Sequence, residues 1–191
     1  FFRRLTEFGA RTSLLVLESA PYVHKILQGI PTEFFVKHAY YRYRHPRPPA
    51  DVHPARDRCG LIWFAPILPF TNAHIWPFLE ACKARFAAHG FDFYVAMLLM
   101  NPRSVICLMA VIYDQEDAEE TRHSRELYDE LLAIMHQQQY QQYRAGLQSW
   151  RALFANAPEL QRLHDTIKAA IDPANILSPG HYGIAYPASP S

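Results

Sequence analysis

Apolar and polar residues alternate along the chain in blocks that predict short strands and amphipathic helices. From residue 72 to residue 89, apolar residues recur every three or four positions, which is the spacing of one helical face. Gly90 follows directly, and glycine is common just past a helix end because it adopts the left-handed conformation without steric cost. The pattern therefore predicts a helix closed by Gly90. Its buried face would consist of Ile75, Phe78, Leu79, Cys82 and Phe86.

Apolar runs on either side of this helix predict buried strands. The first run covers residues 59–65, and we expect Pro66 and Pro69 to end it because proline cannot donate to a sheet. Two further runs cover residues 91–99 and 104–113. The Asn101-Pro102 pair between them is typical of a turn, so these two strands should form a hairpin.

A second long helix and a fourth strand complete the pattern. Residues 116–138 have helical periodicity with acidic side chains in the first turns, which are favourable near the positive end of the helix dipole. Residues 139–146 could form the fourth strand. The order β-α-β-β-α-β predicts an α+β, ferredoxin-like domain. Its sheet should be antiparallel, with both helices on one face.

The regions that flank this domain are less regular. Residues 1–17 mix apolar positions at helical spacing, a break is expected at 18–21, and Thr32 is a candidate N-cap for a helix that starts at Glu33. A proline-rich loop at residues 45–57 suggests a boundary. We therefore expect three parts: an N-terminal helical segment with the proline-rich loop (1–50), the ferredoxin-like domain (51–146), and C-terminal helices with a tail (147–191).

Two helices are expected in the C-terminal part. The first is short, at residues 147–156, and the second covers residues 158–171 with proline in its first turn. One stripe of the second helix is apolar and consists of Leu160, Leu163, Ile167 and Ile171. The tail that starts at Asp172 has no periodicity, but its Pro-Gly turn at residues 179–180 and the asparagine at 175 give it a distinctive pattern.

Composition excludes several classes of protein. The chain has 19 Lys and Arg against 18 Asp and Glu, whereas a dedicated nucleic-acid-binding protein has a clear basic excess. No apolar run reaches the roughly 18 residues needed to cross a bilayer, so no membrane partner is expected. Cys59, Cys82 and Cys107 are far apart and suit neither a disulfide framework nor a zinc site. The ten histidines are scattered, so no metal site is expected.

The chain also lacks the motifs that hold a nucleotide. It has no G-x-G-x-x-G sequence and no phosphate-binding glycine-rich loop, and it contains only seven glycines. Any nucleotide cofactor would therefore need a further domain to bind it.

Tyr143 and Arg144 are the candidate catalytic residues. A phenol beside a guanidinium can hydrogen-bond a phenolate and stabilise its charge, and an arginine near a flavin can stabilise the reduced, anionic ring. The alternative is an ordinary tyrosine at a strand end beside a solvated arginine. The two residues by themselves do not decide between these interpretations.

Several segments, in order, resemble the substrate-domain half of the vanillyl-alcohol oxidase and para-cresol methylhydroxylase family of FAD-linked oxidases. The tail pattern is shared with the wider group of flavin-linked oxidases, and the proline loop and the Tyr-Arg pair narrow the resemblance to enzymes that oxidise phenols. The matching segments are residues 29–32, 40–42, 51–69, 90–93, 143–144 and 172–184.

The resemblance implies a fold and an activity. The fold is the cap domain of FAD-linked oxidases, and the activity is removal of a hydride from the benzylic carbon of a para-substituted phenol through a quinone methide. Tyr143 matches the tyrosine that binds the phenolate, and Arg144 matches the arginine beside phenolate and flavin. The flavin-approaching tail is matched by Asn175, Pro179, Gly180 and His181, although family members often carry lysine where His181 stands.

The resemblance also concerns how the flavin is held. Many members tether FAD through a histidine or tyrosine in the hairpin that corresponds to about residues 93–108. That span contains no histidine here, and its single phenol is Tyr94. We therefore expect non-covalent FAD, with a link to Tyr94 as the alternative.

The expected partners follow from the same resemblance. They are a flavin-binding domain that this chain does not contain, a para-substituted phenol, in some members a c-type cytochrome subunit, and further copies of the protein in a homo-oligomer. Two other functions stay open from the sequence. One is a non-enzymatic ferredoxin-like interaction or dimerisation module, and the other is a flavin oxidase of 2-hydroxy acids.

Overall fold

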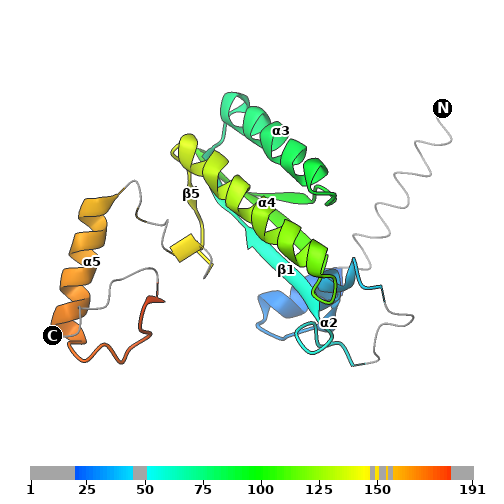
Figure 1. Ribbon diagram of the computed structural model, residues 1–191, viewed down its shortest axis with the longest axis horizontal. Coiled ribbons are helices and arrows are strands. Elements are labelled where there is room, and N and C mark those ends of the chain that lie inside the picture. Colours follow the sequence, from blue (N-terminus) through cyan, green and yellow to red (C-terminus); the bar gives the residue numbers. More distant parts are fainter. Residues whose placement is uncertain (1–19, 45–50, 147–148, 151–153, 155–156, 182–191) are drawn as a thin grey trace. The chain divides into compact units, whose positions relative to one another are not determined.

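The computed structural model describes residues 20–44, 51–146, 149–150, 154 and 157–181 (Figure 1). The chain divides into two compact units, residues 1–60 and residues 61–191. The division lies close to the proline-rich loop. Each unit is described by itself below.

The first unit contains short helical segments. Residues 20–27 are helical, α2 spans Glu33–Val36, and a 3-10 turn, η1, spans Lys37–Tyr40. A break was expected at residues 18–21, but Ala20 and Pro21, the two of these that the structure describes, are helical. Proline is compatible with the first turn of a helix, because the N–H groups there have no acceptor within the helix. A helix does begin at Glu33 as predicted. However, Thr32 Oγ1 is buried without a hydrogen-bond partner, so the expected N-cap bond is absent.

A hydrogen-bonded cluster around Asp57 organises the first unit. The Tyr40 hydroxyl donates to Asp57, and the backbone N–H of His53 donates to the Tyr40 oxygen at 2.8 Å. Arg56 Nε donates to Asp57 Oδ1 at 2.9 Å. These bonds hold the pKa of Asp57 well below its usual range. Burial and the bond to the Asp57 carboxylate raise the pKa of Tyr40 to about 12. The cluster ties η1 to the loop that leads into the first strand.

The sheet has five strands: β1 (Cys59–Phe64), β2 (Pro66–Pro69), β3 (Val95–Asn101), β4 (Ser104–Asp114) and β5 (Gln141–Gln142). Only Ala65 separates β1 from β2, and both pair with β4, so they form one interrupted strand. β3 and β2 pair antiparallel with the same β4 residues, Val105 and Ile106, from opposite sides. The order across the sheet is therefore β5, β1/β2, β4, β3, which is the order of a ferredoxin-like domain. The α+β prediction is confirmed.

The two prolines of β2 do not behave as predicted. Pro66 and Pro69 were expected to end the first strand, but they bound a second one. Pro66 pairs with Gln142 and Pro69 with Ser104. At the ends of a strand the missing N–H removes little of the ladder, so proline is tolerated there.

Two helices pack on one face of the sheet, and they lie side by side in Figure 1. α3 spans Asn72–Ala88 and α4 spans Ala118–Gln137. All five residues of the predicted α3 face are buried. Gly90 has φ +72°, and the N–H of Phe91 donates to the Phe86 carbonyl, so the glycine closes the helix as predicted. Asp117 caps α4 by accepting from the N–H groups of Glu119 and Glu120.

Some strand boundaries differ from the sequence-based expectation. The hairpin of β3 and β4 is confirmed, but β3 begins at Val95 rather than at residue 91. The fourth strand, expected over 139–146, is only the two residues of β5. The next residue stays close to the sheet, because the N–H of Tyr143 donates to the Ala65 carbonyl at 2.8 Å.

The C-terminal helix, α5, spans Pro158–Ile171 as predicted. None of its residues is buried, and the apolar stripe of Leu160, Leu163, Ile167 and Ile171 is between 45% and 71% exposed. The short helix expected at 147–156 lies mostly outside the described residues, of which 149–150 form a 3-10 turn.

All three cysteines are free and buried. Burial raises the pKa of the Cys82 thiol to about 12 and that of Cys107 to about 11. Both thiols therefore stay protonated near neutral pH.

Candidate functional site

The face of the sheet opposite α3 and α4 carries a groove of about 530 Å³. Side chains alternate along β4: Val105, Cys107 and Met109 belong to the core under the helices, whereas Ile106 and Leu108 line the groove. The strands that border β4 supply the remaining apolar walls. These are Leu61, Ile62, Trp63 and Ala65 from the interrupted strand, and Leu98 from β3.

Tyr143 and Arg144 also line this groove, together with Ala145 and Gly146. The Arg144 guanidinium carbon lies 5.3 Å from the centre of the Tyr143 ring, so the cation packs over the phenol. Both side chains are exposed, and among the described residues Arg144 has no carboxylate partner. The site therefore combines one hydroxyl and one uncompensated cation with apolar walls.

Buried hydrogen bonds fix the backbone that carries this pair. Gln142 Nε2 donates to the Tyr128 hydroxyl at 3.2 Å, and Gln142 Oε1 accepts from the Ser149 hydroxyl at 3.1 Å. The Ser149 hydroxyl is also 3.1 Å from the Gly146 carbonyl. Because these groups lie on both sides of residues 143–145, they hold that segment against the middle of α4 and against β2.

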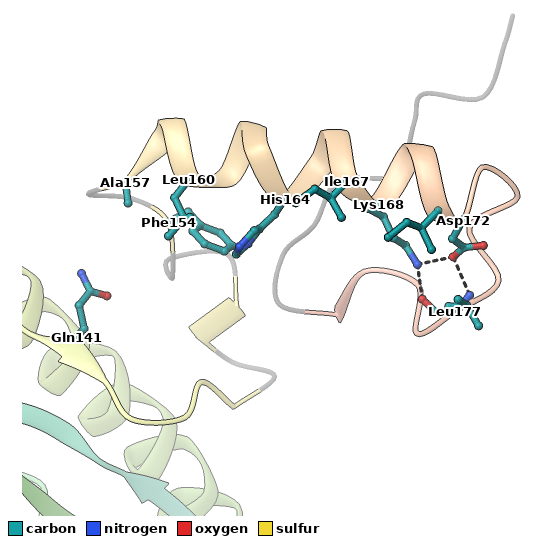
Figure 2. Close-up of a pocket in the computed structure, with 10 residues that line it drawn as sticks. Gln141, Phe154, Ala157, Leu160, His164, Ile167, Lys168, Asp172 and Leu177 are labelled. Carbon is teal, nitrogen blue, oxygen red and sulfur yellow. Dashed lines mark hydrogen bonds and ion pairs between the residues drawn. The ribbon is translucent and has the colours of Figure 1, made fainter. Parts of the chain in front are cut away.

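The tail begins with a turn built around Asp172. Its carboxylate accepts from the N–H groups of Ile176 and Leu177 at 3.0 and 2.9 Å, and it pairs with Lys168. Lys168 also donates to the Leu177 carbonyl, as the dashed lines in Figure 2 show. These bonds lower the pKa of Asp172.

Several tail residues have a left-handed backbone. Asn175 has φ +50°, Ser178 has φ +44° and Gly180 has φ +72°. Asn175 Nδ2 is buried and has no partner among the described residues, so this conformation leaves one donor unsatisfied. Pro179, which precedes Gly180, is exposed.

His181 contacts a residue near the Tyr143-Arg144 pair. Its ring lies 4.2 Å, centre to centre, from that of Trp150, whose Nε1–H donates to the Ala145 carbonyl at 3.1 Å. Trp150 thus connects the predicted tail residue His181 to Ala145, the residue that follows Arg144. Sequence reasoning did not single out Trp150, because a tryptophan in a short irregular segment carries no signal of its own.

A second cavity, of about 730 Å³, lies along the apolar face of α5 (Figure 2). The rings of Phe154 and His164 pack edge to face with centres 5.2 Å apart. Ile167, Ile171 and Leu177 also line this space. Its lining is almost entirely apolar, so it suits packing against another surface better than polar chemistry.

The remaining candidates from the sequence are the possible flavin tether, a metal site and a membrane-spanning helix. Tyr94, the possible tether, directly precedes β3 and is 43% exposed. Among the described residues no group of His, Cys, Asp and Glu could hold a metal ion. None of the helices in that part of the chain is both long and apolar enough to cross a bilayer.

Comparisons with proteins of known function give two relatives, whereas no family model matches. The chain is 33% identical over 180 residues to a 1'-carboxy-chondrochloren decarboxylase of Chondromyces crocatus, a match that covers 94% of this chain and 32% of that protein. It is 32% identical over 126 residues to the 4-cresol dehydrogenase [hydroxylating] flavoprotein subunit of Pseudomonas putida, covering 65% of this chain and 24% of that one.

Solved structures give the same result. A p-cresol methylhydroxylase with substrate bound matches 65% of this chain and 24% of its own, with a TM-score of 0.62 and 28% identity. A 4-ethylphenol oxidase from Gulosibacter chungangensis in complex with isoeugenol matches 66% of this chain over 25% of its own length, with a TM-score of 0.60 and 26% identity. The resemblance to phenol-oxidising flavoproteins of the para-cresol methylhydroxylase type is thereby confirmed, and so is the cap-domain fold. The chain spans about a third or less of the relatives it matches.

Proposed function

We propose that this chain, which resembles the cap domain of para-cresol methylhydroxylase-type flavoproteins, is the substrate-binding part of an FAD-dependent oxidoreductase of para-substituted phenols. The observation that carries the proposal is the groove on the face of the sheet opposite α3 and α4, which is lined by Tyr143 and Arg144 together with apolar side chains. A phenol has the same division into a polar oxygen and an apolar ring.

The two polar residues would act on the phenol oxygen. Tyr143 can hydrogen-bond that oxygen, and the positive charge of Arg144 favours the phenolate over the neutral phenol. A phenolate pushes electron density toward the para position, so a hydride leaves the benzylic carbon more easily. Loss of the hydride gives a quinone methide. Water can then add to the benzylic carbon, or a proton can leave the neighbouring carbon.

FAD, held by a flavin-binding domain outside this chain, would supply the acceptor for the two electrons of the hydride. The unpaired Arg144 and the unsatisfied donor of Asn175 suit contacts with an anionic, acceptor-rich ring. Pro179, Gly180 and His181 belong to the same tail and would complete its contact with the flavin-binding domain. We propose non-covalent FAD, because residues 93–108, where a tether is expected, contain no histidine, and Tyr94 is the single tyrosine among them.

The test uses the complete reading frame, expressed and purified as one protein. It should be yellow, and an anaerobic para-alkylphenol should bleach its flavin absorbance. Replacement of the Tyr143 hydroxyl in Tyr143→Phe should slow bleaching, whereas Tyr113→Phe, which changes a β4 tyrosine packed against the core, should not. A colourless protein that binds no flavin would contradict the proposal.

Oxidative decarboxylation is a second candidate, because the match to the decarboxylase covers 94% of this chain. Here the substrate would carry a carboxylate on the carbon next to the benzylic one. After hydride loss, CO2 leaves that carbon, its bonding pair forms a carbon–carbon double bond, and the phenolate is restored. Release of CO2 from a carboxylated phenol, with no alcohol product from the matching alkylphenol, would favour this reaction over hydroxylation.

The electron acceptor and assembly belong to the proposal as well. Turnover would pass electrons from FAD to oxygen or to a c-type cytochrome subunit, and the complete protein would form a homo-oligomer. Neither nucleic acid nor a membrane is a proposed partner.

A further inference from the structure

Tyr143 and Arg144 lie in a stretch that is neither helix nor strand. Residues 143–146 follow β5 without regular structure, and residues 149–150 form a 3-10 turn. On the N-terminal side of the pair, the N–H of Tyr143 donates to the Ala65 carbonyl at 2.8 Å. Because no regular ladder of hydrogen bonds runs through this stretch, the position of the Arg144 backbone depends on individual bonds to either side of it.

Trp150 restrains the chain on the C-terminal side of the pair. Its indole Nε1–H donates to the carbonyl of Ala145, the residue that follows Arg144, at 3.1 Å. The N–H of the neighbouring Ser149 donates to the Gly146 carbonyl at 3.0 Å. Since the indole is large and only partly exposed, the Ala145 carbonyl cannot turn away without breaking this bond or moving the ring.

The same indole contacts the tail. The ring of His181 lies 4.2 Å from that of Trp150, centre to centre, with 47° between the planes, so the two rings are in contact. His181 also belongs to the Pro-Gly turn, because its N–H donates to the Ser178 carbonyl at 3.1 Å. Trp150 therefore touches both the segment that carries the candidate catalytic pair and the tail that the proposed function places against the flavin-binding domain.

We propose that Trp150 is a positioning residue for phenol oxidation: its indole N–H holds the backbone of Arg144, and its ring links that backbone to His181 in the tail. The inference rests on the proposed function, because it assigns no chemistry to Trp150 and acts through Arg144. A displaced guanidinium weakens the attraction for a phenolate, whereas a neutral phenol is little affected. Docking of the tail and placement of Arg144 are thereby coupled.

Trp150→Phe, made in the complete flavin-loaded protein, removes the indole N–H and keeps a ring beside His181. The probe is 4-cyanophenol, which has no benzylic hydrogen and therefore binds without turnover. Titrations of the flavin absorbance, at pH values below and above the pKa of the probe, give the affinities for its neutral and ionised forms. We expect about 2- to 10-fold weaker binding of the phenolate and unchanged binding of the neutral phenol.

The matched control is Trp76→Phe, which makes the same change at an exposed tryptophan of α3 and should bind both forms like the wild type. Wild-type phenolate binding in Trp150→Phe would overturn the inference. An equal loss for the neutral phenol would do the same, because it would indicate general damage to the groove.

A double-mutant cycle tests whether the effect passes through Arg144. In the Arg144→Ala background, neither Trp150→Phe nor His181→Ala should weaken phenolate binding further, since the charge that they position is gone. His181 is exposed, so His181→Ala keeps this comparison possible if Trp150→Phe does not fold. A full effect of either change without Arg144 would contradict the positioning role.

Hydrogen exchange separates this inference from the proposed function. The indole N–H of Trp150 should exchange at least about 10-fold more slowly than that of the exposed Trp76, and this measurement needs neither flavin nor phenol. Slow exchange in a complete protein that binds no flavin would contradict the proposed function alone. Equal exchange at the two indoles, in a protein that oxidises phenols, would contradict this inference alone.

Discussion

The side-chain amide of Gln142 donates to the hydroxyl of Tyr128 at 3.2 Å, and both residues are buried. Gln142 belongs to β5 and Tyr128 to α4. The bond therefore joins the helical layer to the residue that immediately precedes Tyr143. Burying a polar side chain costs desolvation free energy unless its polar atoms form hydrogen bonds. Ser149 supplies the second partner of Gln142, because its hydroxyl donates to Gln142 Oε1.

Gln142→Leu should destabilise the protein and displace the Tyr143-Arg144 pair. It leaves the Ser149 hydroxyl without its side-chain partner and Tyr128 without its donor, so we expect a loss of about 1–3 kcal/mol in the free energy of unfolding. Urea denaturation measures this. Gln141→Leu, a change at the exposed neighbour in the same strand, is the control and should stay within about 0.5 kcal/mol. Equal losses in both variants would contradict the role of the buried network.

Arg144→Ala should lower kcat/KM for a para-alkylphenol by about 10²-fold in the complete protein, since one charge opposite a developing anion is worth about 3 kcal/mol. Steady-state kinetics measure the effect. Arg144→Lys should recover part of it, because the charge returns without the planar guanidinium. Arg122→Ala removes an arginine of α4 paired with Glu126 and should leave the rate unchanged. Wild-type kinetics in Arg144→Ala would rule out a role for this residue.

Acidification should open the turn at the end of α5. Bonds from Lys168 and from two backbone N–H groups depress the pKa of folded Asp172 below the unfolded value of about 3.9. A depressed pKa means that the ionised form stabilises the turn, and this contribution is present above about pH 4 and lost as the pH falls through the folded value. NMR shifts of the Ile176 and Leu177 amides should report the loss. Asp172→Asn should show the altered shifts already at pH 7; a pH-independent wild-type signal would refute the assignment.

Tyr40 should ionise only under strongly alkaline conditions. Its pKa is raised to about 12 by burial and by the hydrogen bond that its hydroxyl donates to the Asp57 carboxylate. Ultraviolet titration of the wild type minus Tyr40→Phe should isolate a transition well above the usual value of about 10. Tyr41→Phe changes the exposed neighbour and is the matched control. A difference transition near pH 10 for Tyr40 would show that the bond to Asp57 is absent in solution.

Flavin should leave the complete protein on acid precipitation. This follows from the proposed non-covalent FAD, since a covalent link would keep the yellow colour in the pellet. Tyr94→Phe should then have the same flavin content as the wild type. Colour retained in the wild-type pellet and lost in Tyr94→Phe would instead identify Tyr94 as the tether.

Elements with strong periodicity were predictable, and those held by distant contacts were not. The α3 face was correct at all five positions, and α5 had its exact bounds, because helical spacing and the proline at Pro158 are local signals. Pro66 and Pro69 misled the strand assignment. Their tolerance depends on Gln142 and Ser104, partners that sequence spacing does not reveal.

The candidate site divides in the same way. Tyr143 and Arg144 were chosen from their residue types and from the family resemblance, and the structure adds the groove and the cation over the phenol ring. It also adds Trp150, which joins His181 to Ala145 and had no signal in the sequence. The roles assigned to Tyr143, Arg144, Asn175, Pro179, Gly180, His181 and Tyr94 stay predictions.

The sequence by itself determined the α+β class, the amphipathic helices and the residue types available for chemistry, since these depend on periodicity and composition along the chain. Only the tertiary structure decided that β1 and β2 form one interrupted strand, that one face of the sheet carries a groove, and that Tyr143 and Arg144 line it. The physical reason is that strand order and exposure depend on which distant segments pair, and pairing energies are fixed by contacts that local patterns do not encode.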